Sequence, residues 1–138
     1  MMGNKITYLT IEKDNLGQNE AKIAGFYNRY FPEKSNKIIA KNCAAFFIAQ
    51  RNQEFIGVGR LLTDFSRYAL LLDLIVRKIE RNKGTGKTLV KRAISYCQSK
   101  KIQHLILTTD TRADWLTGFY QKLGFKVEND RVLMEFKN

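Results

Sequence analysis

The sequence is poor in several residue types whose scarcity narrows the range of functions. It contains one proline, one histidine, one tryptophan and two cysteines among 138 residues. One histidine and two separated cysteines argue against a zinc site, and we expect no metal. Cys43 and Cys97 lie in apolar surroundings without C-x-x-C spacing. Buried free thiols are therefore favoured over a disulfide or a catalytic thiolate.

Long apolar runs are also missing. No stretch approaches the ~20 residues that span a bilayer, and the first residues lack the apolar core of a signal peptide. These two features predict a cytoplasmic protein without a membrane partner. The length of 138 residues, 44% of them hydrophobic, predicts a single domain over 1–138 with its own core.

Negative charge is scarce compared with positive charge. There are 24 lysines and arginines against 13 aspartates and glutamates, which gives a net charge of +11. This balance favours a polyanion or a phosphorylated cofactor as partner, although charge spread over helices and loops also serves solubility. No RNA-binding motif is present, and aromatic residues are not interleaved with the basic ones. Nucleic acid is therefore disfavoured.

Hydrophobic periodicity predicts the order of helices and strands. Strands are expected over 5–11, 44–50, 54–63, 69–76 and 104–109, and helices over 20–30, 86–99 and 113–123. Asn19 is the expected N-cap of the first helix, Pro32 stops that helix, and Gly124 caps the last one. The segments FKVEN and RVLMEF predict a closing hairpin. The order β-α-β-β-β-α-β-α-β-β describes an α/β protein with a mixed sheet and one parallel crossover.

Two elements of this pattern carry more specific expectations. The strand over 69–76, ALLLDLIV, is nearly continuous in apolar residues, which predicts burial on both faces. His104 opens the next apolar run and is expected at a strand end, because no G-x-S-x-G elbow accompanies it as in a hydrolase triad.

The stretch RNKGTGKTLV, residues 81–90, ends like a P-loop but fails that pattern. Arg81 stands where a P-loop needs its first glycine, and Leu89 where a Rossmann loop needs its third. What remains is a buried strand, a glycine turn and a helix N-terminus, where backbone N–H groups and the helix dipole attract an anion. A pyrophosphate is the expected occupant, with contacts from Arg81, Lys83 and Lys87. A tight turn without a ligand is the alternative.

Three segments resemble the GNAT N-acetyltransferase superfamily. Arg81-x-x-Gly84-x-Gly86 matches its [RQ]-x-x-G-x-[GA] signature, and FYQKLGF at 119–125 resembles its FYxKLGF element. FIAQRNQEFIGVGRLL resembles its second and third strands, so the resemblance covers nearly the whole chain. It implies the acyl-CoA N-acyltransferase fold, with the strands 69–76 and 104–109 splayed at the cofactor cleft. It also implies an acyltransferase that moves an acetyl group from acetyl-CoA to an amine acceptor.

The resemblance also assigns roles by position. The main chain of Leu74, Ile75 and Val76 would pair with the pantetheine arm and the acetyl carbonyl. Tyr120 corresponds to the general acid that protonates the departing thiolate, with a core aromatic as the alternative. The pyrophosphate would lie on the loop formed by Arg81, Asn82, Lys83, Gly84, Thr85, Gly86 and Lys87.

The general base is the least defined role. Asp73 is the only acid within 69–76, and a carboxylate without a partner in an apolar strand is a stronger base than an exposed one. Pairing with a lysine or a backbone amide is the alternative reading of Asp73. Glu80 and Asp110 are further candidates.

Two positions depart from the family pattern. Ala113 stands where an asparagine is frequent, so one cofactor contact must be replaced, and Lys78 stands where a proline is frequent. Besides direct acetyl transfer, a coenzyme-binding module that regulates a partner protein stays open, as does a homodimer. An acetyltransferase acting on aminoacyl-RNA ranks behind both. The segment 26–41, the turn after the third strand and the final hairpin are expected to select the acceptor.

Overall fold

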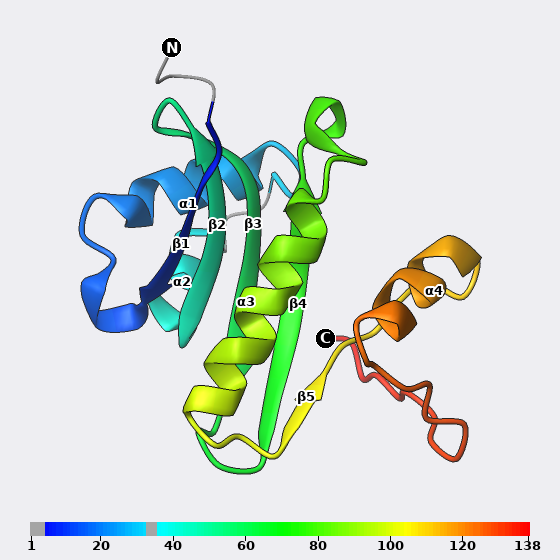
Figure 1. The fold of residues 1–138 in the computed structure, drawn as a ribbon. Coiled ribbons are helices and arrows are strands. Elements are labelled where there is room, and N and C mark those ends of the chain that lie inside the picture. Colours follow the sequence, from blue (N-terminus) through cyan, green and yellow to red (C-terminus); the bar gives the residue numbers. More distant parts are fainter. Residues whose placement is uncertain (1–4, 33–35) are drawn as a thin grey trace. The chain divides into compact units, whose positions relative to one another are not determined.

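A computed structural model describes residues 5–32 and 36–138 of the chain. It divides into two compact units, Met1–Leu107 and Thr108–Asn138. The first unit carries the sheet and all helices but one, and the second carries the last helix and the C-terminal segment. Figure 1 gives the course of the chain through both units.

The first unit is built on a five-stranded sheet with the strand order β1-β2-β3-β4-β5. Neighbouring strands are antiparallel except β4 and β5, which run parallel. The expected mixed α/β sheet is therefore confirmed, although β5 ends at Ile106 and not at 109. The strands are β1 (Thr7–Glu12), β2 (Ala45–Arg51), β3 (Glu54–Thr63), β4 (Tyr68–Val76) and β5 (His104–Ile106).

Helices lie on both faces of this sheet. Helix α3 (Thr85–Ser99) covers one face and makes the crossover from β4 to β5, while α1 (Asn19–Asn28) and α2 (Asn36–Asn42) lie on the other face (Figure 1). Two short 3₁₀ turns, η2 (Lys13–Asn15) and η3 (Lys78–Glu80), precede α1 and α3. Within 5–32 and 36–138, no helix is both long enough and apolar enough to cross a membrane.

Two of these helices differ from the sequence prediction. Helix α1 has Gln18 and not Asn19 at its N-cap, and it ends at Asn28, before Pro32. Helix α2 was not predicted, because its seven residues are too few for a clear periodic pattern. It is anchored by Asn36, whose buried amide group donates hydrogen bonds to Asn28 Oδ1 (2.5 Å) and to the carbonyl oxygen of Phe31 (2.6 Å).

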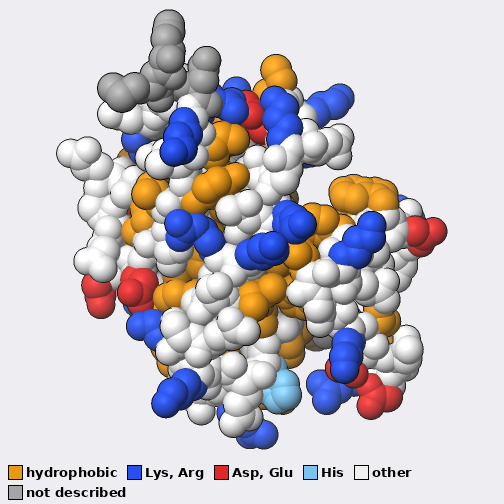
Figure 2. All heavy atoms as spheres, viewed as in Figure 1, with side chains coloured by type: hydrophobic (Ala, Val, Ile, Leu, Met, Phe, Trp, Pro, Cys, Tyr) orange, Lys and Arg blue, Asp and Glu red, His pale blue; other side chains and the backbone are white. Residues whose placement is uncertain are grey.

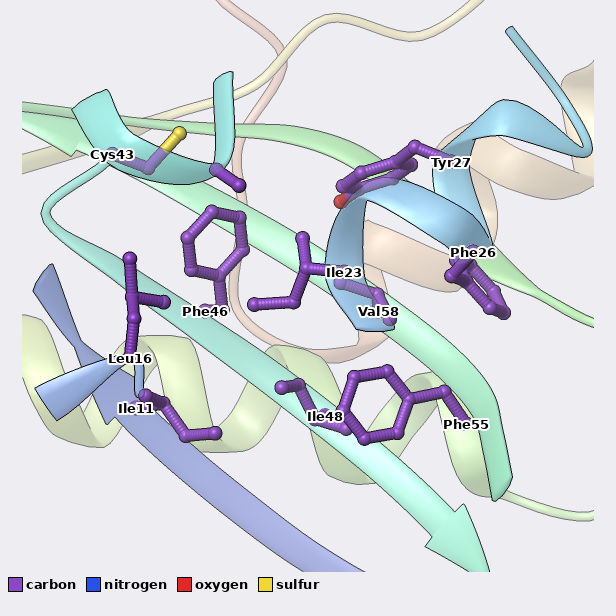
Figure 3. Close-up of a cluster of buried hydrophobic side chains, with 11 residues drawn as sticks. Ile11, Leu16, Ile23, Phe26, Tyr27, Cys43, Phe46, Ile48, Phe55 and Val58 are labelled. Atoms are coloured by element: carbon purple, nitrogen blue, oxygen red, sulfur yellow. The ribbon is translucent and has the colours of Figure 1, made fainter. Parts of the chain in front are cut away.

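The main core lies between the sheet and helices α1 and α2 (Figure 3). Ile23 and Tyr27 of α1 pack against Phe46 and Ile48 of β2 and Val58 of β3, all of them at most 1% exposed. Burying an apolar side chain of this size contributes about 1.5–3 kcal/mol. On the other face, α3 buries Leu89, Val90, Ala93 and Cys97, while Ile94 of the same expected apolar stripe is half-buried.

Strand β4 is less buried than its sequence predicts. Ala69 and Leu71 are buried, but Leu70 is 39% exposed and 72–76 are half-buried. The physical reason is the short β5, which pairs only with the first three residues of β4. The rest of β4 therefore lies at an edge of the sheet within the first unit.

The second unit contains α4 (Asp114–Lys122) followed by an irregular segment. Gly124 has a φ of +103°, and the amide of Phe125 donates to the carbonyl of Tyr120 at 3.1 Å, so the predicted glycine cap is confirmed. The predicted closing hairpin is wrong, because residues 125–138 form no strand. Phe136 is 91% exposed, and a two-stranded hairpin without further strands or a covering helix is marginally stable in water.

Candidate functional site

Strand β4 carries a bulge at its centre. Arg60 of β3 pairs with Leu72 and Val58 pairs with Ile75, so two residues of β4 lie opposite the single residue Gly59. The first of the two, Asp73, has a left-handed φ of +49°. A Cβ at Gly59 would lie 2.9 Å from Leu74 Cδ1, so a larger residue there would force the Leu74 side chain to move.

Asp73 is held at this bulge by two side chains. Arg60 Nε donates to Asp73 Oδ2 at 2.6 Å, and the hydroxyl of Tyr27 donates to the backbone carbonyl of Asp73 at 3.0 Å. Burial, assisted by the charge of Asp73, raises the pKa of Tyr27 well above its usual value, so this hydroxyl stays a donor. We expected Asp73 to be unpaired or to pair with a lysine or a backbone amide, and its partner is an arginine of β3.

Leu74, Ile75 and Val76 follow the bulge at the open edge of β4. On one side, Ile75 and Val76 pair with Val58 and Gly57 of β3. On the other side, β5 ends at Ile106, which pairs with Leu70. Within the first unit, the backbone from Leu71 onwards therefore has no strand partner on the β5 side. The pairing of the two parallel strands thus ends early, and the splay between them stays a prediction.

The loop after β4 presents a row of free backbone donors. The amides of residues 82–87 donate to no backbone acceptor in the described ranges, and the first amide bond of α3 runs from Thr88 to the Gly84 carbonyl at 3.0 Å. Gly84 and Asn82 have positive φ values of +83° and +63°, which bend the chain into the helix. Free amides at the positive end of a 15-residue helix form a site for an anion.

The side chains of this loop fit an anion only in part. Thr85 Oγ1 is buried and has no hydrogen-bond partner among the described residues, which leaves one donor for a ligand oxygen. Arg81 Nε instead donates to the Val76 carbonyl at 2.9 Å, and Lys83 Nζ lies 3.7 Å from Glu80 Oε1. Two of the three cations expected to contact a phosphate are thus engaged within the loop itself.

The two other candidate bases are both in ion pairs. Arg51 at the end of β2 donates to Glu80, and this hydrogen bond lowers the pKa of the Glu80 carboxyl. In the second unit, Arg112 donates to Asp110 at 2.7 Å and likewise lowers its pKa. All three candidate bases, Asp73 included, are therefore paired with an arginine.

Tyr120, the candidate acid, lies on α4 in the second unit and is 8% exposed. Its ring packs edge-to-face against Phe119 at 5.0 Å and Phe125 at 5.6 Å between centroids. Burial raises the pKa of its phenol, so the hydroxyl is protonated at neutral pH and can donate a proton. This packing agrees equally with the role of a core aromatic.

The residues outside the site lie where the sequence places them. Cys43 and Cys97 are buried free thiols whose pKa values are raised by burial, which confirms the prediction. His104 begins β5 and stacks on Tyr68 with 5.1 Å between ring centroids. Figure 2 shows the lysines and arginines scattered over the visible surface, singly and in small groups.

Sequence reasoning missed the residues that hold the site together. Arg60 and Arg51 are the partners of Asp73 and Glu80, and Tyr27 binds the bulge. A signal for Arg60 exists in retrospect, because it is the only basic residue within β3 and Asp73 is the only acid within the neighbouring β4. Recognising the pair requires the register of the two strands.

A mixed sheet with an open edge that leads into a helix N-terminus with free amides has the architecture of an acyl-CoA N-acyltransferase fold. The acetyltransferase (GNAT) family matches residues 5–125. The chain belongs to this family. An N-acetyltransferase of Gracilaria tenuistipitata var. liui, named as uncharacterized, is 30% identical over 105 residues, or 73% of this chain. The match spans 56% of that relative's length.

Solved structures agree with this fold. A GNAT family acetyltransferase from Streptococcus pneumoniae TIGR4 is similar with a TM-score of 0.81, at 21% identity over 97% of this chain and 98% of its own. The aminoglycoside acetyltransferase AAC(6')-Iy, in complex with a bisubstrate analogue of CoA and acetylneamine, gives a TM-score of 0.75 at 18% identity. That match covers 98% of this chain and 99% of the other. At these identities the likeness establishes the fold.

Proposed function

We propose that this protein transfers an acetyl group from acetyl-CoA to a primary amine of a small molecule or a peptide. The row of free amides at 82–87, directly after the open edge of β4, is the observation that carries the proposal. Family membership supports the donor, since AAC(6')-Iy is solved with CoA and with a CoA-derived bisubstrate analogue.

The donor would lie along the open edge of β4. In this proposal the backbone of Leu74, Ile75 and Val76 binds the pantetheine arm, and the loop from Arg81 to Lys87 binds the pyrophosphate through its free amides at 82–87. The orphan hydroxyl of Thr85 and the exposed Lys87 are the side chains that support this placement. Acetyl-CoA, when bound, supplies the acetyl group as an activated thioester.

Two side chains would move the protons. The amine nitrogen attacks the acetyl carbonyl carbon, its proton passes to Asp73 directly or through water, and the C–S bond breaks. Tyr120 gives its proton to the departing sulfur. The Tyr120 phenol is protonated at neutral pH, which the acid role requires, and burial raises its pKa further. Asp73 is fixed by Arg60 through Oδ2, which leaves Oδ1 for the amine.

The acceptor is proposed only as a class. Two aminoglycoside acetyltransferases are among the structurally similar proteins, so a small polyamine-like or amino-sugar acceptor belongs in any screen. The segment 26–41 and the β3–β4 turn remain the predicted selectors of the acceptor. A cytoplasmic location and a homodimer likewise stay predictions.

A regulatory coenzyme-binding module is the second candidate. It is favoured by one observation, namely that Asp73, Glu80 and Asp110 all lie in ion pairs with arginines. A module of this kind binds acetyl-CoA but turns over no amine.

The experiment that tests the proposal has two stages. Calorimetric titration with CoA and with acetyl-CoA measures binding, and 3′-dephospho-CoA and pantetheine show which part of the coenzyme is recognised. Release of free thiol is then followed across amines, amino acids, aminoglycosides and peptides. Binding with thiol release supports the enzyme, and binding without turnover across the panel supports the regulatory module. Absence of binding overturns both.

A further inference from the structure

Glu80 is out of place for a loop that binds an anion. It lies two residues before the free amide row at 82–87, and it is 7% exposed. Among the described residues it is the only charged residue that is buried. Its pKa is lowered by the hydrogen bond from Arg51, so it is ionised at neutral pH. A fixed negative charge beside the site opposes a phosphate by simple electrostatics.

The contacts of Glu80 join the loop to the sheet. Oε2 accepts a hydrogen bond from Arg51, the last residue of β2. Oε1 is buried without a hydrogen-bond partner in the described part of the chain, and its nearest cation is Lys83 Nζ at 3.7 Å. The carboxylate therefore holds one residue of the sheet and one residue of the loop.

A second, crossed ion pair lies beside the first. Arg51 and Glu54 face each other across the β2–β3 turn. Glu54 binds Arg77, at the beginning of the loop, and the Arg77 amide also donates to the Ile56 carbonyl at 2.8 Å. The turn is thus connected to both ends of the segment from Arg77 to Glu80.

The geometry points to Glu80 as a positioning residue that, through Arg51, orients the amides of the coenzyme loop for the pyrophosphate. This inference rests on the proposed function. Arg51 neutralises the charge of Glu80, so this charge is tolerated beside the site. In return, the contact with Arg51 holds the loop in place just before the free amides at 82–87. The Glu54–Arg77 pair is more exposed, with the Glu54 side chain 58% accessible, and contributes less.

The sign of one substitution distinguishes positioning from charge. Glu80→Gln keeps the shape of the side chain, removes the negative charge and releases Lys83. If Glu80 acts only as a charge, CoA binds more tightly to the variant. If Glu80 positions the loop, CoA binds more weakly, about tenfold, because the part-buried ion pair with Arg51 is broken and the amides lose their orientation.

Glu80→Asp is a second variant that distinguishes the charge of Glu80 from its positioning of the loop. It also provides a test if Glu80→Gln does not fold. It keeps the charge but shortens the side chain, so only positioning predicts weaker binding. Glu54→Gln is the matched control, with an expected change of less than about twofold. Once an acceptor is known, a rise in KM for acetyl-CoA with little change in kcat is expected for both Glu80 variants, whereas acetyl-pantetheine, which lacks the pyrophosphate, reacts equally with all forms.

The outcomes are distinct. Weaker CoA binding to both Glu80 variants, with unchanged binding to Glu54→Gln, supports the inference. Equal or tighter binding to Glu80→Gln overturns it and leaves the proposed function intact. A wild-type protein that binds no CoA overturns the proposed function, and the inference with it.

Discussion

Arg60 and Asp73 face each other across β3 and β4, with 2.6 Å between the guanidinium Nε and the carboxylate Oδ2. Their side chains are 16% and 30% exposed, so the pair is partly shielded from water. The pair lies at the bulge that begins the open half of β4, and the bulge carbonyl is bound by Tyr27. A carboxylate fixed in this way has one defined orientation. This favours a role as the base that accepts the proton of the amine over a role as a solvated surface charge.

Asp73→Asn tests this role. We expect turnover to fall about a hundredfold, because a positioned base contributes at least that factor, while the Kd of CoA stays within about twofold. The amide keeps an oxygen that can accept from Arg60, so the fold should persist. Initial rates of thiol release and calorimetric CoA binding measure the two effects. A variant with wild-type turnover removes Asp73 from the mechanism.

Tyr120→Phe tests the acid. The hydroxyl donates no hydrogen bond to the described residues, so its removal should leave thermal stability nearly unchanged. Turnover should fall about a hundredfold, with CoA affinity retained, because only the protonation of the leaving sulfur is lost. Tyr96→Phe is the matched control. The Tyr96 hydroxyl donates to Glu12 at 2.9 Å, and neither residue belongs to the loop at 81–87. That variant should lose some stability and keep its turnover. If Tyr120→Phe instead keeps its turnover and loses thermal stability, Tyr120 serves packing alone.

The sequence predicted elements well where periodicity was strong. The bounds of β3 agree at both ends, and α3 begins one residue early. Helix α2 and the early end of β5 escaped prediction, because seven residues give too little pattern and strand length depends on the partner strand. The closing hairpin failed for a related reason. Alternation at Phe125 and Val127 marks a potential strand, but a strand forms only where a neighbour completes its hydrogen bonds.

The sequence predicted the backbone part of the candidate site but not the partners of its side chains. A glycine turn before a helix predicted the free amides at 82–87 because that property belongs to every helix N-terminus. The partners of Asp73, Glu80 and Lys83 depend on strand register and on the crossed contacts of the β2–β3 turn. These are long-range features that residue types alone do not encode.

Asp64 gives a prediction on pH dependence. Its Oδ1 accepts amide hydrogen bonds from Ser66 (2.8 Å), Tyr68 (3.1 Å) and Arg67 (2.9 Å), and these lower its pKa below the ordinary value of 3.8. A lowered pKa in the folded state means that the stabilisation is complete above pH 3.8 and is lost as the pH falls through the folded value. Asp64→Asn keeps an acceptor oxygen but does not titrate. The Tm difference between wild type and this variant should be constant near neutral pH and shrink in acid. A constant difference at all pH values would exclude the carboxylate as its source.

Gly84→Ala tests the geometry of the amide row directly. Nothing lies within 4 Å of the position of a Cβ there, so the added methyl group meets no clash. The cost comes from the φ of +83°, a left-handed conformation that costs an alanine roughly 1–2 kcal/mol. The loop can relieve that strain only by turning the amides of 82–87 away from their present directions. We therefore expect a lower Tm together with weaker CoA binding, measured by thermal unfolding and calorimetry.

Gly25→Ala is the matched control, because Gly25 lies inside α1 with open space around it. Alanine there should raise stability by up to about 1 kcal/mol and leave CoA binding unchanged. If Gly84→Ala lowers the Tm while CoA binds as before, the amide row is not the phosphate site.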